Sequence, residues 1–351
     1  MLPFRRTRHL YSRTLRFLLA AAATTLFAAT PKAAFAQQTH YPLTLTNCGQ
    51  EITFEQAPER VVSVGQSSTE ILYLLGLADK VVGTALWLGP VLEEFEAVNA
   101  EIPRLADNAP SFESVLSAKP ALVTTQFESQ IGPKGVVATT AQFADLGIPV
   151  YTAPADCIGK DNSTGGDGLR TETFAMDLIY REIDDLARIF DVKERGEALI
   201  ADLKAREAAA KEKIATLTGD ISAVFWFSSA ELQTDPYVAG RRGAPAYIMS
   251  TLGIRNVIDS AEEWPTIGWE TIARADPTVI VAGEMDRRRY PADDLAVKLE
   301  FLRTDPVTSL MPAVREDRIV IMDAQAMNPT IRTIEGIEIL AEGLAQVGLA
   351  K

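Results

Sequence analysis

The chain has 351 residues, and its content of 47% apolar and 23% charged residues is that of a folded globular protein. Its 47 acidic side chains outnumber the 34 basic ones, and a protein this acidic repels nucleic acids and anionic lipid surfaces. The only histidines are His9 and His40, so the rest of the chain cannot form a Ser-His or Cys-His catalytic pair or a histidine-ligated metal or haem site. Carboxylate chemistry and ligand binding remain as functions to consider.

The first 36 residues have the composition of a secretory signal peptide. They contain six basic residues and no acidic residue, and their uncharged apolar run, 17–29, is too short to span a bilayer. Ala34-Phe35-Ala36 fits a signal-peptidase site, so we expect cleavage before Gln37 and export to the periplasm. The remaining chain has 28 basic and 47 acidic residues, a formal charge of about −19. No cysteine follows the leader in a lipid-attachment motif, which predicts a free periplasmic protein.

The two cysteines, Cys48 and Cys157, belong to the exported part of the chain. In an oxidising compartment an even number of cysteines is typical of a disulfide before it is typical of a metal site. Two separate buried thiols are the alternative. We expect a Cys48–Cys157 disulfide, because both residues flank predicted strands of the same half of the chain.

The first half of the exported chain alternates short apolar strands with helices. The pattern predicts strands at 44–46, 52–54, 60–64, 81–84, 121–124 and 148–151. It predicts helices at 91–100, 112–118 and 136–146, and one after strand 60–64 that Ser67 or Ser68 caps and Gly76 ends. Continuous apolar strands that alternate with helices indicate a parallel sheet covered on both faces.

A long helix is predicted at 193–216, where Ala, Glu, Lys, Leu and Ile dominate and proline is absent. Its apolar stripe is narrow, so we expect a connector at the surface; a coiled coil is the alternative, for which the stripe is short. The α/β pattern then restarts, with strands at 223–227, 279–282 and 319–322 and helices at 244–252, 269–275 and 334–347. The predicted divisions are a signal peptide (1–36), an N-terminal α/β lobe (37–192), a spine helix (193–217) and a C-terminal α/β lobe (218–351).

One local unit occurs in both halves. Ser111-Phe112-Glu113 opens a helix that leads to Pro120 and a strand, and Gly268-Trp269-Glu270 opens a helix that leads to Pro277 and a strand. Each glutamate stands seven residues before its proline and directly after an aromatic residue.

With these pieces in this order, the whole exported chain resembles the periplasmic substrate-binding proteins of ABC importers for iron-siderophores, haem and cobalamin. Further matching pieces are Val81-Val82-Gly83 and the turn Leu252-Gly253-Ile254-Arg255-Asn256-Val257, in which Ile254 replaces the family's second glycine. The resemblance implies two α/β lobes, each a mostly parallel sheet with flanking helices, joined by one rigid helix. It also implies a monomer without a cofactor of its own, which hands its ligand to an importer made of a permease dimer and its ATPase.

In that family a glutamate on each lobe docks onto arginines of the permease, and Glu113 and Glu270 occupy the matching positions. A rival explanation needs no partner, because an acid in the first turn of a helix is favoured by the helix dipole by about 0.3 to 1 kcal/mol. The matched spacing of the two units favours docking onto a dimeric partner.

The ligand is expected in the cleft between the lobes, at the carboxyl ends of the strands. Basic clusters at 241–242 and 287–289 indicate an anionic ligand, because arginine forks suit carboxylate, catecholate or phosphate oxygens; solvated surface loops are the alternative. The candidate ligand-binding residues are Trp87, Trp226, Tyr237, Arg241, Arg242, Arg287, Tyr290 and Arg332. For Trp226, inside an apolar strand, the protein core is the stronger interpretation.

Three classes of function compete: import receptor, enzyme, and adhesive or structural protein. An enzyme is disfavoured because the chain lacks a P-loop, a dinucleotide-binding fingerprint and a nucleophile elbow. Among receptors, free zinc or manganese is disfavoured by the lack of histidine. A ferric siderophore is therefore the first expectation, with cobalamin or haem as alternatives, and Tyr237 or Tyr290 is the candidate ligand to haem iron.

Overall fold

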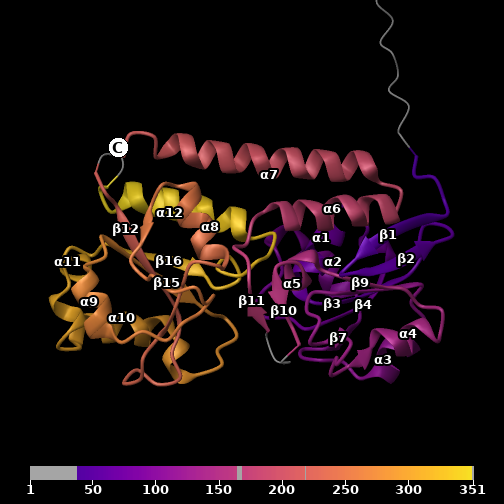
Figure 1. The fold of residues 1–351 in the computed structure, drawn as a ribbon, viewed down its shortest axis with the longest axis horizontal. Helices are drawn as coiled ribbons and strands as arrows, with labels where there is room; N and C mark the ends of the chain where they lie inside the picture. Colours follow the sequence, from indigo (N-terminus) through magenta and orange to yellow (C-terminus); the bar gives the residue numbers. More distant parts are fainter. Residues whose placement is uncertain (1–37, 164–167, 218, 350–351) are drawn as a thin grey trace, which may run out of the picture. The chain divides into compact units, whose positions relative to one another are not determined.

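The computed structural model describes residues 38–163, 168–217 and 219–349, so the predicted signal peptide lies outside the described residues (Figure 1). The chain from residue 36 onward forms one compact unit. Within this unit two parallel sheets, each flanked by helices, make the two predicted α/β lobes. The boundaries that we assigned to the lobes stay predictions.

The first sheet has five parallel strands in the order β5-β4-β3-β6-β9, which span Arg104–Ala106, Val81–Ala85, Val61–Val64, Leu122–Thr125 and Val150–Thr152. Its central strand β3 is fully buried, which explains its uninterrupted apolar sequence apart from Ser63. The helices and short strands of this lobe are α1 (Gln66–Leu74), α2 (Glu96–Glu101), α3 (Phe112–Ser117), α4 (Thr140–Ala144), α5 (Pro154–Cys157), α6 (Asp177–Ile189), β7 (Ile131–Gly132), β8 (Ala138–Thr139), β10 (Lys160–Asp161) and β11 (Leu169–Arg170).

The predicted N-terminal hairpin and the predicted disulfide are both present. Strands β1 (Leu43–Asn47) and β2 (Gln50–Phe54) pair in antiparallel fashion around Cys48 and Gly49. Cys48 is bonded to Cys157 at the end of α5, and their Cα atoms are 5.6 Å apart. The alternative of two separate thiols is therefore wrong.

The second sheet runs in the order β13-β12-β15-β16, with β14 paired to the other part of β12; these strands span Tyr237–Val238, Ser222–Ser228, Val279–Glu284, Ile319–Asp323 and Arg255–Asn256. Only β13 is antiparallel to its neighbour, so the prediction of mostly parallel sheets is confirmed. The helices of this lobe are α8 (Ala244–Thr251), α9 (Trp269–Ala275), α10 (Leu295–Thr304), α11 (Pro312–Arg315) and α12 (Thr333–Gln346).

Helix α7 (Lys193–Lys213) is the predicted spine helix (Figure 1). It has 21 residues and ends three residues before the predicted boundary. It contacts α6 of the first lobe and α12 of the second, and most of its surface is exposed. Gly196 permits the close contact with α6, because a Cβ at this position would lie 2.5 Å from the Cβ of Ala187.

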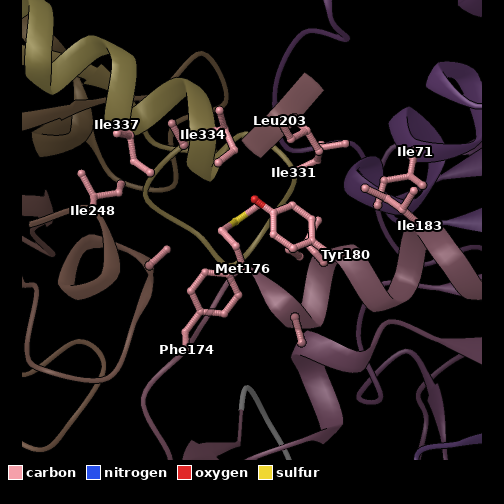
Figure 2. Close-up of a cluster of buried hydrophobic side chains, with 14 of the residues drawn as sticks. Ile71, Phe174, Met176, Tyr180, Ile183, Leu203, Ile248, Ile331, Ile334 and Ile337 are labelled. Carbon is pink, nitrogen blue, oxygen red and sulfur yellow. The ribbon is translucent and has the colours of Figure 1, made fainter. Parts of the chain in front are cut away.

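One apolar cluster continues from the first lobe into the second beneath α7 (Figure 2). Phe174 and Met176, which precede α6, and Tyr180 within it are buried together with Ile331 and Ile334 of the second lobe. The lobes therefore share a core, which is why they form one compact unit.

Two local predictions are wrong and one is incomplete. Helix α1 begins at Gln66 after Gly65, which has a φ of 138°, and neither Ser67 nor Ser68 caps it. The backbone N–H of Ser67 instead donates to Oε1 of Gln126 in the loop after β6, at 3.0 Å. Helix α4 starts at a capping box formed by Thr139 with Gln142, and so is shorter than the predicted helix. Helices α6 and α10 were not among the helices predicted from the sequence.

Replacing both cysteines by serine should lower the free energy of unfolding by about 4 to 5 kcal/mol, because the disulfide closes a loop across a separation of 109 residues. Urea denaturation of the double variant and the parent measures this difference. Thiol titration of the unfolded, unreduced parent should find no free thiol; two reactive thiols would contradict the assignment.

Candidate functional site: the cleft between the lobes

A cavity of about 650 Å³ lies between the two lobes. Its walls include the segments that follow the carboxyl ends of the strands in both sheets, as expected for parallel α/β sheets, together with residues of α6, β11 and β13. In the first lobe these segments follow β3, β4, β6 and β9, and in the second they follow β12, β15 and β16. Its size is that of a small-molecule binding site.

Aromatic rings form part of both walls. Phe127 comes from the first lobe, and Phe227, Tyr237, Trp264 and Tyr290 come from the second. The rings of Phe227 and Trp264 lie 4.5 Å apart between centroids with an interplanar angle of 30°. These surfaces can pack against the apolar body of a ligand.

Of the residues that we expected to bind ligand, Tyr237, Arg287 and Tyr290 line this cleft. Trp87 does not: its ring is buried, and its Nε1 donates to Oγ1 of Thr84 at 3.2 Å. Its neighbours Leu86 and Leu88 reach the cavity instead.

Trp226 lies in the core of the second lobe and not on the cleft wall. Its ring is fully buried and packs edge-on against Trp269, with centroids 4.9 Å apart. Because side chains alternate along a strand, Phe227 is the residue that faces the cleft. This position supports the core interpretation and argues against ligand contact by Trp226.

Arg241 and Arg242, for which we expected a direct role, are also absent from the cleft wall. Arg241 is exposed and pairs with Asp259 at 2.8 Å. Nη1 of Arg242 donates to the backbone carbonyl of Arg170 in the first lobe, at 2.7 Å. The cluster at 241–242 therefore contributes one contact between the lobes and one surface ion pair.

Arg332 forms a buried ion pair between the lobes. Its Nε donates to Oε2 of Glu70 at 3.1 Å and its Nη2 to Oε1 at 2.5 Å, while Nη1 donates to Oδ2 of Asp323 at 2.9 Å. Nη2 also donates to the carbonyl of Pro90. Glu70 stands on α1 of the first lobe and Arg332 precedes α12 of the second, so this fork fixes one lobe against the other.

Two further arginines cross between the lobes at the edge of the cleft. Nε of Arg170 in the first lobe lies 3.2 Å from Oε2 of Glu263 in the second. Nη1 of Arg287 in the second lobe donates to the carbonyls of Trp87 at 2.6 Å and Asp107 at 2.8 Å in the first. Arg242 and Arg287, one from each basic cluster, thus contact the opposite lobe, which the expectation of an anionic ligand did not foresee.

Glu182 is a cleft residue that the sequence analysis missed. It stands on α6, lines the cavity, and has only 1% of its surface exposed. Oγ of Ser68 donates to its Oε1 at 2.7 Å, and burial raises the pKa of the carboxyl to about 7. The sequence does indicate that Glu182 lies on the apolar face of a helix, because it falls three residues after Ile179 and four before Leu186.

Lys298 on α10 supports the second wall from behind. Its Nζ donates to the carbonyls of Phe227 at 2.6 Å and Gly283 at 2.7 Å, at the ends of β12 and β15. Burial lowers the pKa of its ammonium group to about 8. The side chain has no exposed surface, so it cannot touch a ligand directly but does hold two cleft segments together.

Glu113 and Glu270 lie in the first turns of α3 and α9, and both are exposed. Ser111 caps α3, since the N–H of Ser114 donates to its Oγ at 3.1 Å, whereas α9 follows Gly268 without a side-chain cap. The two glutamates are available to a partner, and their docking role stays a prediction.

Two other kinds of feature are absent from residues 38–163, 168–217 and 219–349. In those ranges no group of three or more His, Cys, Asp or Glu side chains is placed to hold a metal ion. Within the same ranges, no helix has the length and apolarity needed to cross a membrane.

Known proteins share this architecture and parts of this sequence. The family described as "Periplasmic binding protein" matches residues 61–326. An uncharacterised ABC transporter substrate-binding lipoprotein of Bacillus subtilis, YvrC, is 23% identical over 308 residues, or 87% of this chain and 86% of the relative.

Two solved structures share the fold. A periplasmic binding protein of Veillonella parvula matches with a TM-score of 0.71 and 22% identity, over 86% of this chain and 97% of that one. An ABC-type Fe3+-hydroxamate transport protein of Saccharomonospora viridis matches with a TM-score of 0.66 and 24% identity, over 87% and 99%. The names of other relatives refer to vitamin B12 or to heme.

Replacing Arg332 by methionine should lower the free energy of unfolding by about 3 to 5 kcal/mol, because Glu70 keeps a buried charge without its partner. Arg241→Met is the matched control, and removal of its exposed pair with Asp259 should cost less than about 1 kcal/mol. Urea denaturation measures both. Adding Glu70→Gln to Arg332→Met should restore part of the loss, and equal small effects of the two arginine variants would contradict the assigned role.

Proposed function

Because the chain belongs to the periplasmic binding protein family, we propose that it binds a ferric siderophore in the cleft and delivers it to an ABC-type inner-membrane importer. The family comprises substrate-binding proteins of ABC importers and not enzymes.

The observation that carries the proposal is the cleft itself. Its volume of about 650 Å³ suits a compact metal chelate, and its walls combine aromatic rings with polar side chains from both lobes. A relative with this fold is named for Fe3+-hydroxamate transport, which supports an iron chelate as the first candidate.

Cobalamin and haem are the alternatives, because relatives at similar identity are named for vitamin B12 and heme. Tyr237 and Tyr290 line the cleft, and a tyrosine oxygen is a known ligand of haem iron. Cobalamin needs no such ligand and would use the aromatic walls.

We further propose that Glu113 and Glu270 dock onto the permease. Each is exposed at the start of a helix in its own lobe, so the pair offers two anions to a dimeric partner. We also propose that the protein is a monomer.

We propose that the protein is free in the periplasm after cleavage of its signal peptide. The Bacillus relative is named a lipoprotein, but the cysteines of this chain are joined to each other as Cys48–Cys157. A thiol in that bond cannot also carry a lipid.

The identity of the ligand can be tested on protein purified from its own periplasm. Native mass spectrometry should find a bound ferric chelate, and the visible spectrum should lack the Soret band of haem and the bands of a corrinoid. A bound corrinoid or haem would replace the siderophore with that alternative. Iron removal by reduction and chelation should abolish the visible absorption of a ferric siderophore.

The docking proposal predicts that Glu113→Ala with Glu270→Ala leaves ligand affinity within about twofold of the parent and abolishes uptake, since charged interface contacts are lost. The matched control is Glu51→Ala with Glu300→Ala, which removes one exposed glutamate from each lobe outside those helix starts. Uptake of radiolabelled iron chelate and fluorescence titration measure the two effects. Normal uptake by the Glu113/Glu270 variant would refute the docking role.

A further inference from the structure

The cleft has an excess of acidic side chains. Its lining includes four basic and six acidic residues: Lys160, Arg170, Arg287 and Arg289, against Asp156, Glu182, Glu263, Asp286, Asp293 and Asp323. The whole exported chain is also strongly acidic. Both charges oppose the entry of an anion.

Most of the basic groups on the wall are already engaged by the protein. Nζ of Lys160 lies 2.6 Å from Oδ1 of Asp156, and Arg170 pairs with Glu263. Arg287 is held by backbone carbonyls of the first lobe. Of the four basic residues in the described lining, only Arg289 has neither a carboxylate nor a carbonyl partner, and its guanidinium lies over the ring of Tyr290, 5.4 Å from the centroid.

The acidic groups are less fully compensated. Glu182 reaches the cavity from a buried position with Ser68 as its hydrogen-bond donor, and none of the ion pairs among the described residues includes it. Asp293 is fully buried, accepts from Oγ of Ser228 and from the N–H of Tyr290, and interacts electrostatically with the ammonium group of Lys298, so its charge is compensated within the protein. A ligand with several negative charges would therefore lie near the Glu182 carboxylate, which has no cationic partner among the described residues, and would find a single available guanidinium, that of Arg289.

Uncharged polar groups are plentiful on the same walls. Ser129, Gln130, Gln325 and Asn328 carry hydroxyl or amide groups that both donate and accept hydrogen bonds. Oε1 of Gln130 is buried and has no hydrogen-bond partner within the described structure. Together with the aromatic rings, these groups match a ligand whose periphery presents carbonyl and amide groups.

We propose that the cleft selects an uncharged metal complex with a carbonyl- and amide-rich periphery, and that Glu182 is the specificity-determining residue that excludes polyanionic chelates. The inference rests on the proposed receptor function and narrows its ligand class. A ferric trihydroxamate and a corrinoid share this chemistry, whereas a ferric tricatecholate carries three negative charges and haem carries two carboxylates.

The expected discrimination follows from Coulomb's law. At an intermediate dielectric, each pair of like charges about 8 Å apart weakens binding by roughly threefold to tenfold. A trianionic complex should therefore bind up to about tenfold more weakly at pH 8 than an uncharged complex of similar size, because proton uptake by Glu182, whose pKa is about 7, limits the penalty to about that factor.

The first experiment titrates the ligand-free protein with four probes: ferrichrome, cyanocobalamin, haemin and ferric enterobactin. Quenching of tryptophan fluorescence at pH 8, one unit above the pKa of Glu182, gives the dissociation constants. At least one uncharged probe should bind about threefold to tenfold more tightly than both anionic probes. Tighter binding of ferrichrome than of cyanocobalamin would indicate a hydroxamate ligand, and the reverse order would indicate a corrinoid.

The second experiment compares Glu182→Gln with Asp185→Asn. The glutamine removes the charge but keeps the shape and the hydrogen-bonding groups, so the preference for the uncharged probe should fall by about threefold or more. Asp185 is the control, because it is a buried carboxyl on the same helix, bonded to Tyr151, outside the cleft lining. Its replacement should not lower the preference, because loss of the Asp185 charge lowers the pKa of Glu182 and keeps that carboxylate ionised.

Different outcomes would overturn the neutral-ligand inference, the role of Glu182 or the receptor function. Tighter binding of haemin or ferric enterobactin, or equal binding of all four probes, would overturn the neutral-ligand inference and leave the receptor function standing. An unchanged preference in a folded Glu182→Gln protein would overturn the role of Glu182. Failure of all four probes to bind would overturn the proposed function itself.

Discussion

The apolar cluster beneath α7 is the interaction on which the rest of the structure depends (Figure 2). Side chains around Met176 and Tyr180 in the first lobe pack with Ile331 and Ile334 of the second, and α7 covers them. Because a close-packed core resists deformation, this cluster fixes the distance between the two sheets. The strand ends then face each other across a gap of set width, which is the cleft.

A layer of arginines supplements this core where it reaches the cleft. Arg332, Arg170 and Arg287 each reach across to the opposite lobe. Buried ion pairs such as those of Arg332 and Arg170 add little net stability but are costly to break, so they favour one arrangement of the lobes over others. The planar fork of arginine suits this task better than lysine would, since it meets two acceptors in one plane.

The sequence revealed the fold in outline because parallel strands buried on both faces have continuous apolar sequences. The strands at 60–64 and 279–282 show this pattern, and the low hydrophobicity of 193–216 distinguished the spine from core helices. Helix α6 was not predicted, although Ile179, Ile183 and Leu186 recur at helical spacing along one face. The burial of its acidic residue Glu182 depends on tertiary contacts and could not be read from that spacing.

The candidate site was predictable only in its location. That loops after the strands would form the cleft follows from topology, and Tyr237, Arg287 and Tyr290 were found in this way. Which arginines would be engaged by the opposite lobe depends on contacts between residues more than 70 positions apart, such as Arg242 with Arg170. No local pattern carries that information.

The chain passes into α7 only after the sheet of the first lobe is complete, and this order has a consequence for export. All five strands of that sheet and both cysteines precede residue 193, so the first lobe can fold and oxidise while the second is still being translocated. During that interval Phe174, Met176 and Tyr180 lack the second-lobe side chains that cover them. The half-translocated chain thus presents an apolar patch until the segment that carries Ile331 and Ile334 arrives and covers it.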